Sequence, residues 1–466
     1  MTTTVVSSYV LKGVTAVPVT IECELIDRLP SVTIVGLSAS SVREVAERVR
    51  SAFQSSGYEW PRKRVVISVH PLDLSKDGAG LDLPIALALL EAMGEIPVAK
   101  LHGLAAVGEL SLAGDLRPVR GTVAMAVQAN QGDQKLLLPA NNVAGTMGFR
   151  SLVSVVSYLN ERRQGDAVPA LPTFGTDRHP LDMADVRGQK MAKKAMELAA
   201  VLDYGLLLVG APGSGKTMLA ARMPSILPQA DDDVLLEVAT IHDAAGLLLP
   251  GFLEQTKRPF RAPHHSISTA GMIGSARLHP GEASLAHGGV LFLDELPEFR
   301  RDVLELLRGP MDDGEIVLNR SSGRTVIPST FLLIAAMNPC PCGYRGHARR
   351  SCRCQQSSID RYLGRAKPMI RQLPIKVELE PMSMAALDKA KLGESSAEIR
   401  ARVTRAQAIL MLENMNLTDD ERRALSARPW SEIVLSRVSR AIAVLAGRKT
   451  ATKSDMAEAL TFIDLE

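Results

Sequence analysis

The sequence predicts an α/β fold, and three apolar segments carry this prediction. Residues 205–209 are apolar, and they lead through a glycine-rich stretch into helix-compatible residues 218–221. Residues 290–293 form a second apolar segment, which ends in two acids, and residues 331–337 form a third, which ends in Asn338. Because neighbouring strands of an α/β sheet deliver the residues that follow them to one edge, we expect these three ends to form a single site.

The glycine-rich stretch matches the pattern G-x-x-x-x-G-K-[ST] between a predicted strand and a predicted helix, which is the setting that a phosphate-binding loop requires. Glycines let backbone N–H groups converge on phosphates, and the following helix directs its positive dipole end at them. A plain glycine-rich turn is the weaker interpretation, because strand, Lys and Thr are all in register. The predicted nucleotide-binding residues are Gly210, Ala211, Pro212, Gly213, Ser214, Gly215, Lys216 and Thr217.

These residues predict ATP and Mg²⁺ as cofactors. Lys216 is expected to reach the β and γ phosphates, while the Thr217 hydroxyl and Asp294 ligate Mg²⁺. Glu295 is placed to polarise the attacking water, and Asn338 to orient that water or the γ-phosphate. A strand that ends in solvated acids is common by itself, but beside a phosphate-binding loop the combination indicates nucleotide hydrolysis.

Length and composition predict a soluble, multidomain enzyme. The 466 residues correspond to about three domains. No apolar run approaches 18 residues and the first residues lack a signal-peptide pattern, so we expect a cytoplasmic protein without a membrane partner. The 54 Lys and Arg residues nearly balance the 51 Asp and Glu residues, so any DNA-binding surface must be local.

The pattern of apolar residues and the positions of Gly and Pro divide the chain into four parts. Residues 1–165 are β-rich, with helices expected near 41–54 and 83–93. Residues 166–180 are rich in Gly and Pro and read as a linker. The phosphate-loop module covers residues 181–379, and residues 380–466 are helical in pattern.

Four of the five cysteines lie in one segment, as two C-x-C pairs separated by nine residues. In a reducing compartment this grouping favours a tetrahedral Zn²⁺ site, although C-x-C is tighter than the usual spacing. Four unliganded thiols remain the alternative. The candidate zinc ligands are Cys340, Cys342, Cys352 and Cys354.

Two basic segments are candidates for DNA contact. Residues 314–328 predict a β-hairpin with Arg320 and Arg324 near its tip, and further arginines, including Arg349 and Arg350, surround the cysteine segment. Arginine is suited to phosphate contact. The alternative is that these arginines are ordinary solvated surface residues.

Several long motifs together resemble the ComM/YifB family of magnesium-chelatase-like AAA+ ATPases, over almost the whole chain. They are Asp185-Val186-Arg187-Gly188-Gln189, Arg261-Ala262-Pro263-His264-His265-Ser266, the segment 290–297, Asn338-Pro339-Cys340-Pro341-Cys342-Gly343 and Leu425-Ser426-Ala427-Arg428. The resemblance implies an AAA+ P-loop core with a helical lid, preceded by an α+β domain like those of Lon protease and ribosomal protein S5. It also implies a homohexameric motor, acting on branched or single-stranded DNA in branch migration, recombination and transformation.

Two alternatives stay open beside that function: a magnesium-chelatase-like ATPase that remodels a protein, and an ATP-binding scaffold with weak turnover. The second follows from a departure from the family pattern. Gln372 stands where the family carries its arginine finger, and Arg371 is one residue away. An arginine finger is worth about 10³–10⁵ in rate, so we expect impaired hydrolysis. Arg428 matches the family's second sensor residue.

The resemblance of the first domain to Lon protease does not extend to its catalytic pair. Gly80 stands at the position of the nucleophilic serine, and Val123 at about the position of the partner lysine. A Ser–Lys pair needs both the attacking oxygen and the amine that takes its proton. The sequence therefore predicts a domain without protease activity.

Overall fold

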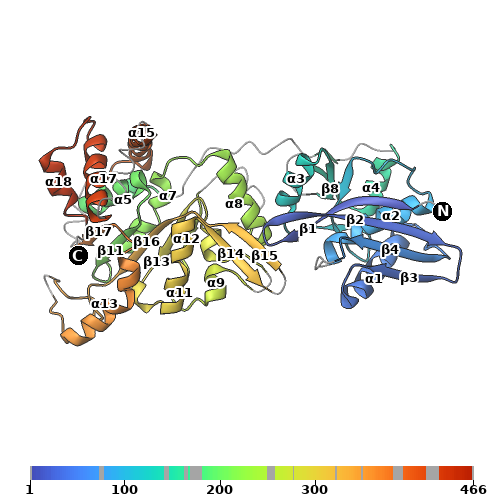
Figure 1. Cartoon of the computed structure of the whole chain (residues 1–466), viewed down its shortest axis with the longest axis horizontal. Coiled ribbons are helices and arrows are strands. Elements are labelled where there is room, and N and C mark those ends of the chain that lie inside the picture. The colour runs from blue at the N-terminus through green and yellow to red at the C-terminus, as the bar shows by residue number, and fades with distance from the viewer. Residues whose placement is uncertain are drawn as a thin grey trace.

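A computed structural model describes residues 3–72, 78–140, 146–161, 166–167, 181–248, 258–275, 278–320, 323–347, 350–380, 392–415 and 430–463. Two sheets organise these residues, one of eight strands from the first third of the chain and one of five strands from the middle. Figure 1 shows them at opposite ends of the long axis of the molecule, with the C-terminal helices beside the second sheet.

The eight-stranded sheet has the order β10-β9-β8-β5-β1-β2-β4-β3. Its strands are β1 (Thr4–Lys12), β2 (Thr15–Ile26), β3 (Ser31–Val35), β4 (Arg64–His70), β5 (Leu104–Ala106), β8 (Lys135–Pro139), β9 (Thr146–Phe149) and β10 (Asp166–Ala167). β1 and β2 form an antiparallel hairpin that turns at Gly13, where φ is +66°. β10 pairs with β9, so the first two residues of the predicted linker belong to this sheet; residues 168–180 lie outside the described residues.

Four helices accompany this sheet: α1 (Ala39–Ser55), α2 (Asp82–Met93), α3 (Thr122–Gln131) and α4 (Leu152–Leu159). α1 and α2 confirm the helices expected from the apolar spacing near 41–54 and 83–93. α2 is buried from Asp82 to Glu91. Asp82 is compensated by a two-pronged ion pair with Arg48 of α1, at 2.7 and 3.0 Å, which satisfies a charge that burial would otherwise make costly. The remaining elements of this region are η1 (Gly78–Leu81) and a small ladder of β6 (Glu109–Leu110) and β7 (Leu116–Arg117).

The second sheet is parallel throughout and has the order β12-β13-β16-β11-β17. Its strands are β11 (Leu206–Gly210), β12 (Phe260–Arg261), β13 (Val290–Leu293), β16 (Leu332–Met337) and β17 (Ile375–Leu379). β13 and β16 are buried along their whole length, as expected for strands covered on both faces. The α/β prediction is therefore confirmed for this sheet, and the three predicted strands all belong to it.

Short and long helices cover the parallel sheet. They are α5 (Lys190–Leu202), α6 (Lys216–Ala220), α7 (Met223–Ile226), α8 (Asp232–Ala244), α9 (Thr269–Ile273), α10 (Glu282–Leu285), α11 (Arg301–Leu306), α12 (Arg308–Asp313) and α13 (Gln356–Ile370), with the 3₁₀ turns η2 (Met183–Asp185) and η3 (Leu296–Glu298). The last described part of the chain is helical, with α15 (Ser396–Met415), α17 (Trp430–Leu445) and α18 (Lys453–Ala459). Ile399 of α15 and Val438 of α17 share one core cluster with Leu206 of β11, so these helices pack onto the parallel sheet.

The predicted β-hairpin is present as β14 (Glu315–Arg320) and β15 (Gly323–Pro328). It reaches toward the first sheet in Figure 1. Thr325 of β15 is buried, and a Cβ added to Gly13 of the β1–β2 turn would lie 2.5 Å from its Oγ1. The hairpin therefore packs against the first domain close to the arginines that the sequence assigned to DNA.

A second contact between the two sheets' domains involves a buried carboxylate. Asp243 of α8 accepts hydrogen bonds from the Thr122 hydroxyl at 3.0 Å and from the Val123 backbone N–H at 2.8 Å, at the start of α3. Burial raises the pKa of Asp243, while these donors oppose the shift. A carboxylate at a helix N-terminus is also favoured by the helix dipole. The interaction fixes α8 to the first domain.

None of the helices in the described parts of the chain combines the length and apolar character needed to cross a membrane.

Candidate nucleotide and metal sites

The glycine-rich stretch forms a loop between the end of β11 and the start of α6. Gly213 and Gly215 have φ values of +77° and +94°, which residues with a side chain rarely adopt. Gly215 is the N-cap of α6, so the backbone N–H groups of the first helical turn face the loop. The Ser214 hydroxyl is buried and has no hydrogen-bond partner among the described residues. This loop therefore offers donors to an anion, as a phosphate-binding loop must.

Lys216 is held inside this loop by three oxygen atoms. Its Nζ donates to the carbonyl oxygens of Gly210 at 2.7 Å and Ala211 at 3.1 Å, and to Oδ1 of Asn338 at 3.1 Å. Burial lowers the pKa of Lys216, against the attraction of Asp294 and Glu295. A buried ammonium group that faces a cavity fits the negative charge of a triphosphate, and its contact with Asn338 brings two of the predicted site residues together.

The two acids that follow β13 face the same loop. Oδ2 of Asp294 accepts a hydrogen bond from the Thr217 hydroxyl at 2.8 Å, so both predicted Mg²⁺ ligands are adjacent. Glu295 has a φ of +55°, a conformation uncommon for residues other than glycine. Its Oε2 lies 3.5 Å from Nδ1 of His265, which belongs to the segment between β12 and α9.

These residues line one cavity of about 350 Å³ at the carboxyl edge of the parallel sheet. Its lining is Pro212, Gly213, Ser214, Gly215, Lys216, Thr217, Met218, Asp294, Glu295, Met337 and Asn338. Ligands of open α/β sheets bind at this edge. The hydroxyl, two carboxylates, ammonium and amide fit a Mg²⁺–nucleotide, because they supply oxygen ligands for the metal and donors for the phosphates.

Three further residues support the cavity, and the sequence analysis gave them no role. Gln189 donates to the carbonyl oxygens of Ser214 at 3.2 Å and Glu380 at 2.9 Å, and so joins the loop to the chain beyond β17. The Tyr362 side chain of α13 hydrogen-bonds the backbone of Asn338. His265, the third, contacts Glu295. Gln189 and His265 lie in motifs that carried the family resemblance, and their place in these motifs was the feature of the sequence that could have identified them.

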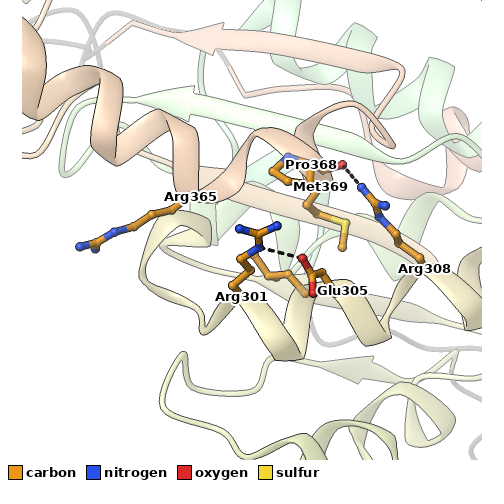
Figure 2. A pocket seen from close by; sticks show the side chains of 7 residues that line it. Arg301, Glu305, Arg308, Arg365, Pro368 and Met369 are labelled. Atoms are coloured by element: carbon orange, nitrogen blue, oxygen red, sulfur yellow. Dashed lines mark hydrogen bonds and ion pairs between the residues drawn. The ribbon is translucent and has the colours of Figure 1, made fainter.

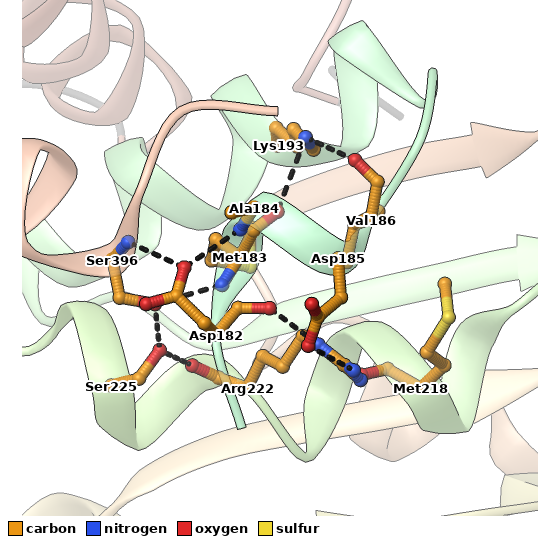
Figure 3. A network of polar contacts seen from close by, with 10 residues as sticks. All are labelled: Asp182, Met183, Ala184, Asp185, Val186, Lys193, Met218, Arg222, Ser225 and Ser396. Atoms are coloured by element: carbon orange, nitrogen blue, oxygen red, sulfur yellow. Dashed lines mark hydrogen bonds and ion pairs between the residues drawn. The ribbon is translucent and has the colours of Figure 1, made fainter. Parts of the chain in front are cut away.

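A polar network connects the nucleotide loop to the C-terminal helices (Figure 3). Oδ1 of Asp182 accepts from the backbone N–H of Ser396, the first residue of α15, at 2.9 Å. The Ser396 hydroxyl lies 2.7 Å from the hydroxyl of Ser225 in α7. Arg222 donates to the backbone carbonyl oxygens of Asp182 at 2.8 Å and Met218 at 3.0 Å. Since Met218 lines the cavity, this network joins the first residue of α15 to the wall of the candidate nucleotide site.

The four clustered cysteines converge as the sequence predicted. Their Sγ atoms all lie within 4.8 Å of one another, and those of Cys340, Cys342 and Cys352 are 3.4–3.7 Å apart. Zn–S bonds of about 2.3 Å in a tetrahedron separate sulfurs by about 3.8 Å. The backbone N–H groups of Tyr344 and Arg353 lower the pKa of Cys342 to about 6, whereas burial and the neighbouring sulfurs, against backbone hydrogen bonds, raise the pKa of Cys352 and Cys354. The cluster fits a tetrahedral metal site.

Arginines gather near the C-terminal part of α13 (Figure 2). Arg301, Arg308 and Arg365 line a small pocket there with Pro368 and Met369. Glu305 pairs with Arg301 at 2.7 Å, and Glu298 pairs with Arg365 at 3.7 Å, so two of these three arginines face acidic side chains.

Arg371 is the exposed C-cap of α13. It precedes β17, whose first residue, Ile375, pairs with Leu206 at the start of β11. The end of α13 is therefore at the edge of the sheet opposite to the phosphate loop. An arginine at this edge is remote from the phosphate loop of its own chain. Arg428 lies outside the described residues.

The arginines assigned to DNA are placed only in part. Arg324 is exposed on β15. Arg320 is the last residue of β14, and Arg349 lies outside the described residues. Arg350 donates to the Tyr344 hydroxyl at 2.7 Å, and its guanidinium lies 5.1 Å from the centroid of the tyrosine ring. Arg350 is thus engaged within the cysteine loop.

Within the described residues, the four cysteines are the only group of His, Cys, Asp or Glu side chains that converges as metal ligands do. His264, His265 and His287 take part in other contacts: His264 pairs with Ser266 at 2.8 Å, and His287 with Glu237 at 2.8 Å.

The fold and the cavity define a P-loop protein of the α/β class, and sequence comparison identifies its family. A profile described as magnesium chelatase, subunit ChlI, matches residues 182–387, and a second, described as subunit ChlI of Mg-chelatase, matches residues 21–142. The first match covers the parallel sheet and its nucleotide cavity, and the second covers most of the eight-stranded sheet.

Full-length relatives agree with these profiles. The YifB protein of Salmonella typhimurium is 38% identical over 421 residues, which cover 87% of this chain and 82% of the relative. The competence protein ComM of Haemophilus influenzae is 34% identical over 502 aligned positions, which cover 99% and 97%. A magnesium-chelatase 67 kDa subunit of Chlorobaculum parvum is 28% identical over 158 residues, 33% of this chain and 23% of that protein. The chain belongs to the ComM/YifB family of magnesium-chelatase-like AAA+ proteins.

Proposed function

We propose that this protein is an ATP-driven AAA+ motor that binds DNA and promotes branch migration in recombination. One observation carries the ATPase part of the proposal: Lys216, Thr217, Asp294, Glu295 and Asn338 converge on a single cavity at the end of the phosphate loop. The DNA part is supported by the similarity along the whole chain to a relative named for competence.

The residues of the cavity divide the hydrolytic work among them. Lys216 binds the terminal phosphates and balances their charge, and the loop N–H groups hold the chain of phosphates in place. Thr217 and Asp294 would hold Mg²⁺, which supplies positive charge to the phosphate oxygens. Glu295 accepts the proton of the attacking water. Asn338 orients the terminal phosphate through its contact with Lys216.

We propose a ring of six copies, in the cytoplasm, with each site completed by an arginine of the next copy. The position of Arg371 and of the arginine pocket at the opposite edge of the sheet supports this arrangement. Gln372 stands at the family's finger position, and it favours a second candidate: a nucleotide-binding scaffold with weak turnover. The remaining alternative, remodelling of a protein in the manner of magnesium chelatase, rests on the shared profile.

We also propose that the cysteine cluster holds one structural Zn²⁺ per chain. The sulfur separations support this assignment. Metal analysis of purified protein should give about one zinc per chain, and Cys340→Ser with Cys352→Ser should release it. Zinc-free protein with native circular dichroism would reject the proposal.

The first domain, residues 1–165, is proposed to be Lon/S5-like and without protease activity. A Cβ added at Gly80 would meet only ordinary contacts, 3.7 Å from Val107 and 3.9 Å from Val119, so the position has room for a side-chain carbon but carries no nucleophile. Val123 is buried beside Ala239 of α8. We propose residues 166–180, 181–379 and 380–466 as the linker, core and lid, with the first two residues of the linker paired with β9.

ATPase measurements with and without forked DNA test the proposal. We expect ATP hydrolysis that DNA stimulates, loss of nucleotide binding or turnover in Lys216→Ala, and tight retention of ATP in Glu295→Gln. Unchanged hydrolysis in both variants would overturn the ATPase assignment. Hydrolysis that DNA leaves unchanged would instead favour a protein remodeller, and nucleotide binding without turnover would favour the scaffold.

A further inference from the structure

The cysteine loop packs directly on the phosphate loop. Gly343, one residue after Cys342, has a φ of +81°, and a Cβ added there would lie 2.6 Å from Cδ and 2.9 Å from Cγ of Pro212. Pro212 lines the nucleotide cavity. Even one extra methyl group at residue 343 would therefore push against the wall of the cavity.

The same loop is also tied to the opposite side of the cavity. Asn338, which accepts a hydrogen bond from Lys216, is two residues before Cys340, and Cys340 is fully buried. The Gly343 N–H donates to the Cys340 carbonyl at 2.9 Å and closes a tight turn that carries two of the four cysteines. The turn thus touches the phosphate loop through Gly343 and continues into the polar residue that contacts the phosphate-binding lysine.

Besides the sulfurs, contacts between side chains and not regular secondary structure hold this turn, such as the hydrogen bond from Arg350 to the Tyr344 hydroxyl. No helix or strand is present among the described residues between β16, which ends at Met337, and α13, which begins at Gln356. The segment also uses a second left-handed glycine, Gly346, with a φ of +77°. A chain of this kind carries a large conformational entropy when it is not cross-linked, and a metal bound to four cysteines removes much of it.

We propose that the cysteine-bound metal holds Gly343 against Pro212 and thereby fixes the phosphate loop, so that metal occupancy sets the affinity of the protein for nucleotide. The inference rests on the proposed zinc and nucleotide sites. It adds that the two are coupled, although no cysteine lines the cavity among the residues described. Gly343 and Pro212 are positioning residues in this scheme.

Two glycines of the same turn provide a matched pair of variants. Gly343→Ala and Gly346→Ala introduce the same methyl group at the same left-handed backbone conformation, but an added Cβ at Gly346 has no described atom within 4 Å. We expect Gly343→Ala to keep about one zinc per chain and to bind a fluorescent ATP analogue with a Kd raised about tenfold or more. Gly346→Ala should keep both the zinc content and the wild-type Kd.

Metal removal tests the coupling in the other direction. Full-length protein stripped with a zinc chelator and returned to Mg²⁺ should show a raised Kd for the analogue, and zinc alone should restore it. In Pro212→Ala, which lacks the ring that Gly343 touches, stripping should change the Kd much less than in the wild type. This variant keeps the test decisive even if Gly343→Ala loses its metal.

The outcomes separate the inference from the proposals beneath it. Wild-type nucleotide affinity in zinc-loaded Gly343→Ala, or in stripped native protein, would overturn the coupling and leave the ATPase and zinc assignments standing. Failure of the unmodified, zinc-loaded protein to bind nucleotide would overturn the proposed function itself, and the coupling with it.

Discussion

His265 offers a quantitative test of how the Glu295 carboxylate, the proposed general base, is held. Its Nδ1 is 3.5 Å from Oε2 of Glu295, longer than a well-formed hydrogen bond, and the two side chains are 35% and 55% exposed. A pair that is this long and this accessible to water contributes about 1 kcal/mol or less. If the contact persists in the reacting complex, its loss corresponds to at most about a fivefold decrease in rate.

We therefore expect His265→Ala to lower kcat about two- to fivefold and to leave nucleotide affinity unchanged. His265→Gln should recover part of the loss, because an amide N–H can donate to the same carboxylate. The matched control is His264→Ala: the centroids of the two tilted rings are 4.0 Å apart, but the described hydrogen bonds of His264 involve Ser266. Steady-state ATPase rates and binding of a fluorescent nucleotide measure the two quantities separately.

The double variant decides whether His265 acts through Glu295. Removal of a general base costs about 10²–10⁴ in rate, so Glu295→Gln should dominate, and adding His265→Ala to it should cause little further loss. A full additional decrease in the double variant, a raised Kd without a change in kcat, or an unchanged kcat in His265→Ala would each refute the reasoning.

Three other predictions follow from the remaining features. We expect slow ATP hydrolysis that becomes faster when residues 371–374 are replaced by Asp-Arg-Phe-Asp. If the native protein instead hydrolyses ATP fast and Arg371→Ala abolishes that activity, Arg371 is the arginine that acts on the neighbouring site. If Arg308→Ala abolishes it, the arginine of the pocket has that role. DNA affinity, measured by fluorescence anisotropy over a series of salt concentrations, should fall steeply as salt rises. The slope of the logarithm of affinity against the logarithm of salt concentration should be smaller by about one in Arg324→Ala. An identical slope would exclude Arg324 as a phosphate contact. Asp243→Ala leaves buried donors at the start of α3 unsatisfied, at a cost of about 1–3 kcal/mol each. Calorimetry should therefore show a lower unfolding temperature for Asp243→Ala than for Asp243→Asn. Equal unfolding temperatures would contradict the role of Asp243 in holding α8 to α3.

Local signals were enough to predict most of the nucleotide site. The phosphate loop and the strands before Asp294 and Asn338 are contiguous in sequence, because a strand, a tight turn and a helix start are specified by neighbouring residues. The same holds for α1 and α2, whose apolar spacing is regular. The cysteine pairs also converge as predicted, since their spacing is short enough for a single loop to close on one metal.

Contacts between distant segments could not be predicted in this way. His265 meets Glu295, Asp243 meets Thr122, and Gly343 meets Pro212 across separations that leave no periodic pattern in the chain. The packing of the hairpin against Gly13 likewise places Thr325 of β15 against the first domain, a contact that no pattern in the chain indicated.

The sequence by itself therefore predicted the chemistry of the proposed sites: which residues would hold phosphate, which would hold metal, and that Gly80 and Val123 stand where a Lon-like protease pair is expected. Those properties reside in residue types and short spacings. The tertiary structure decided which parts contact one another. It packs the cysteine turn on Pro212 and places Arg371 at the edge of the parallel sheet opposite to the phosphate loop. Such relations depend on how strands are ordered and which surfaces pack, and these are set by the burial of side chains from the whole chain, not by any one segment.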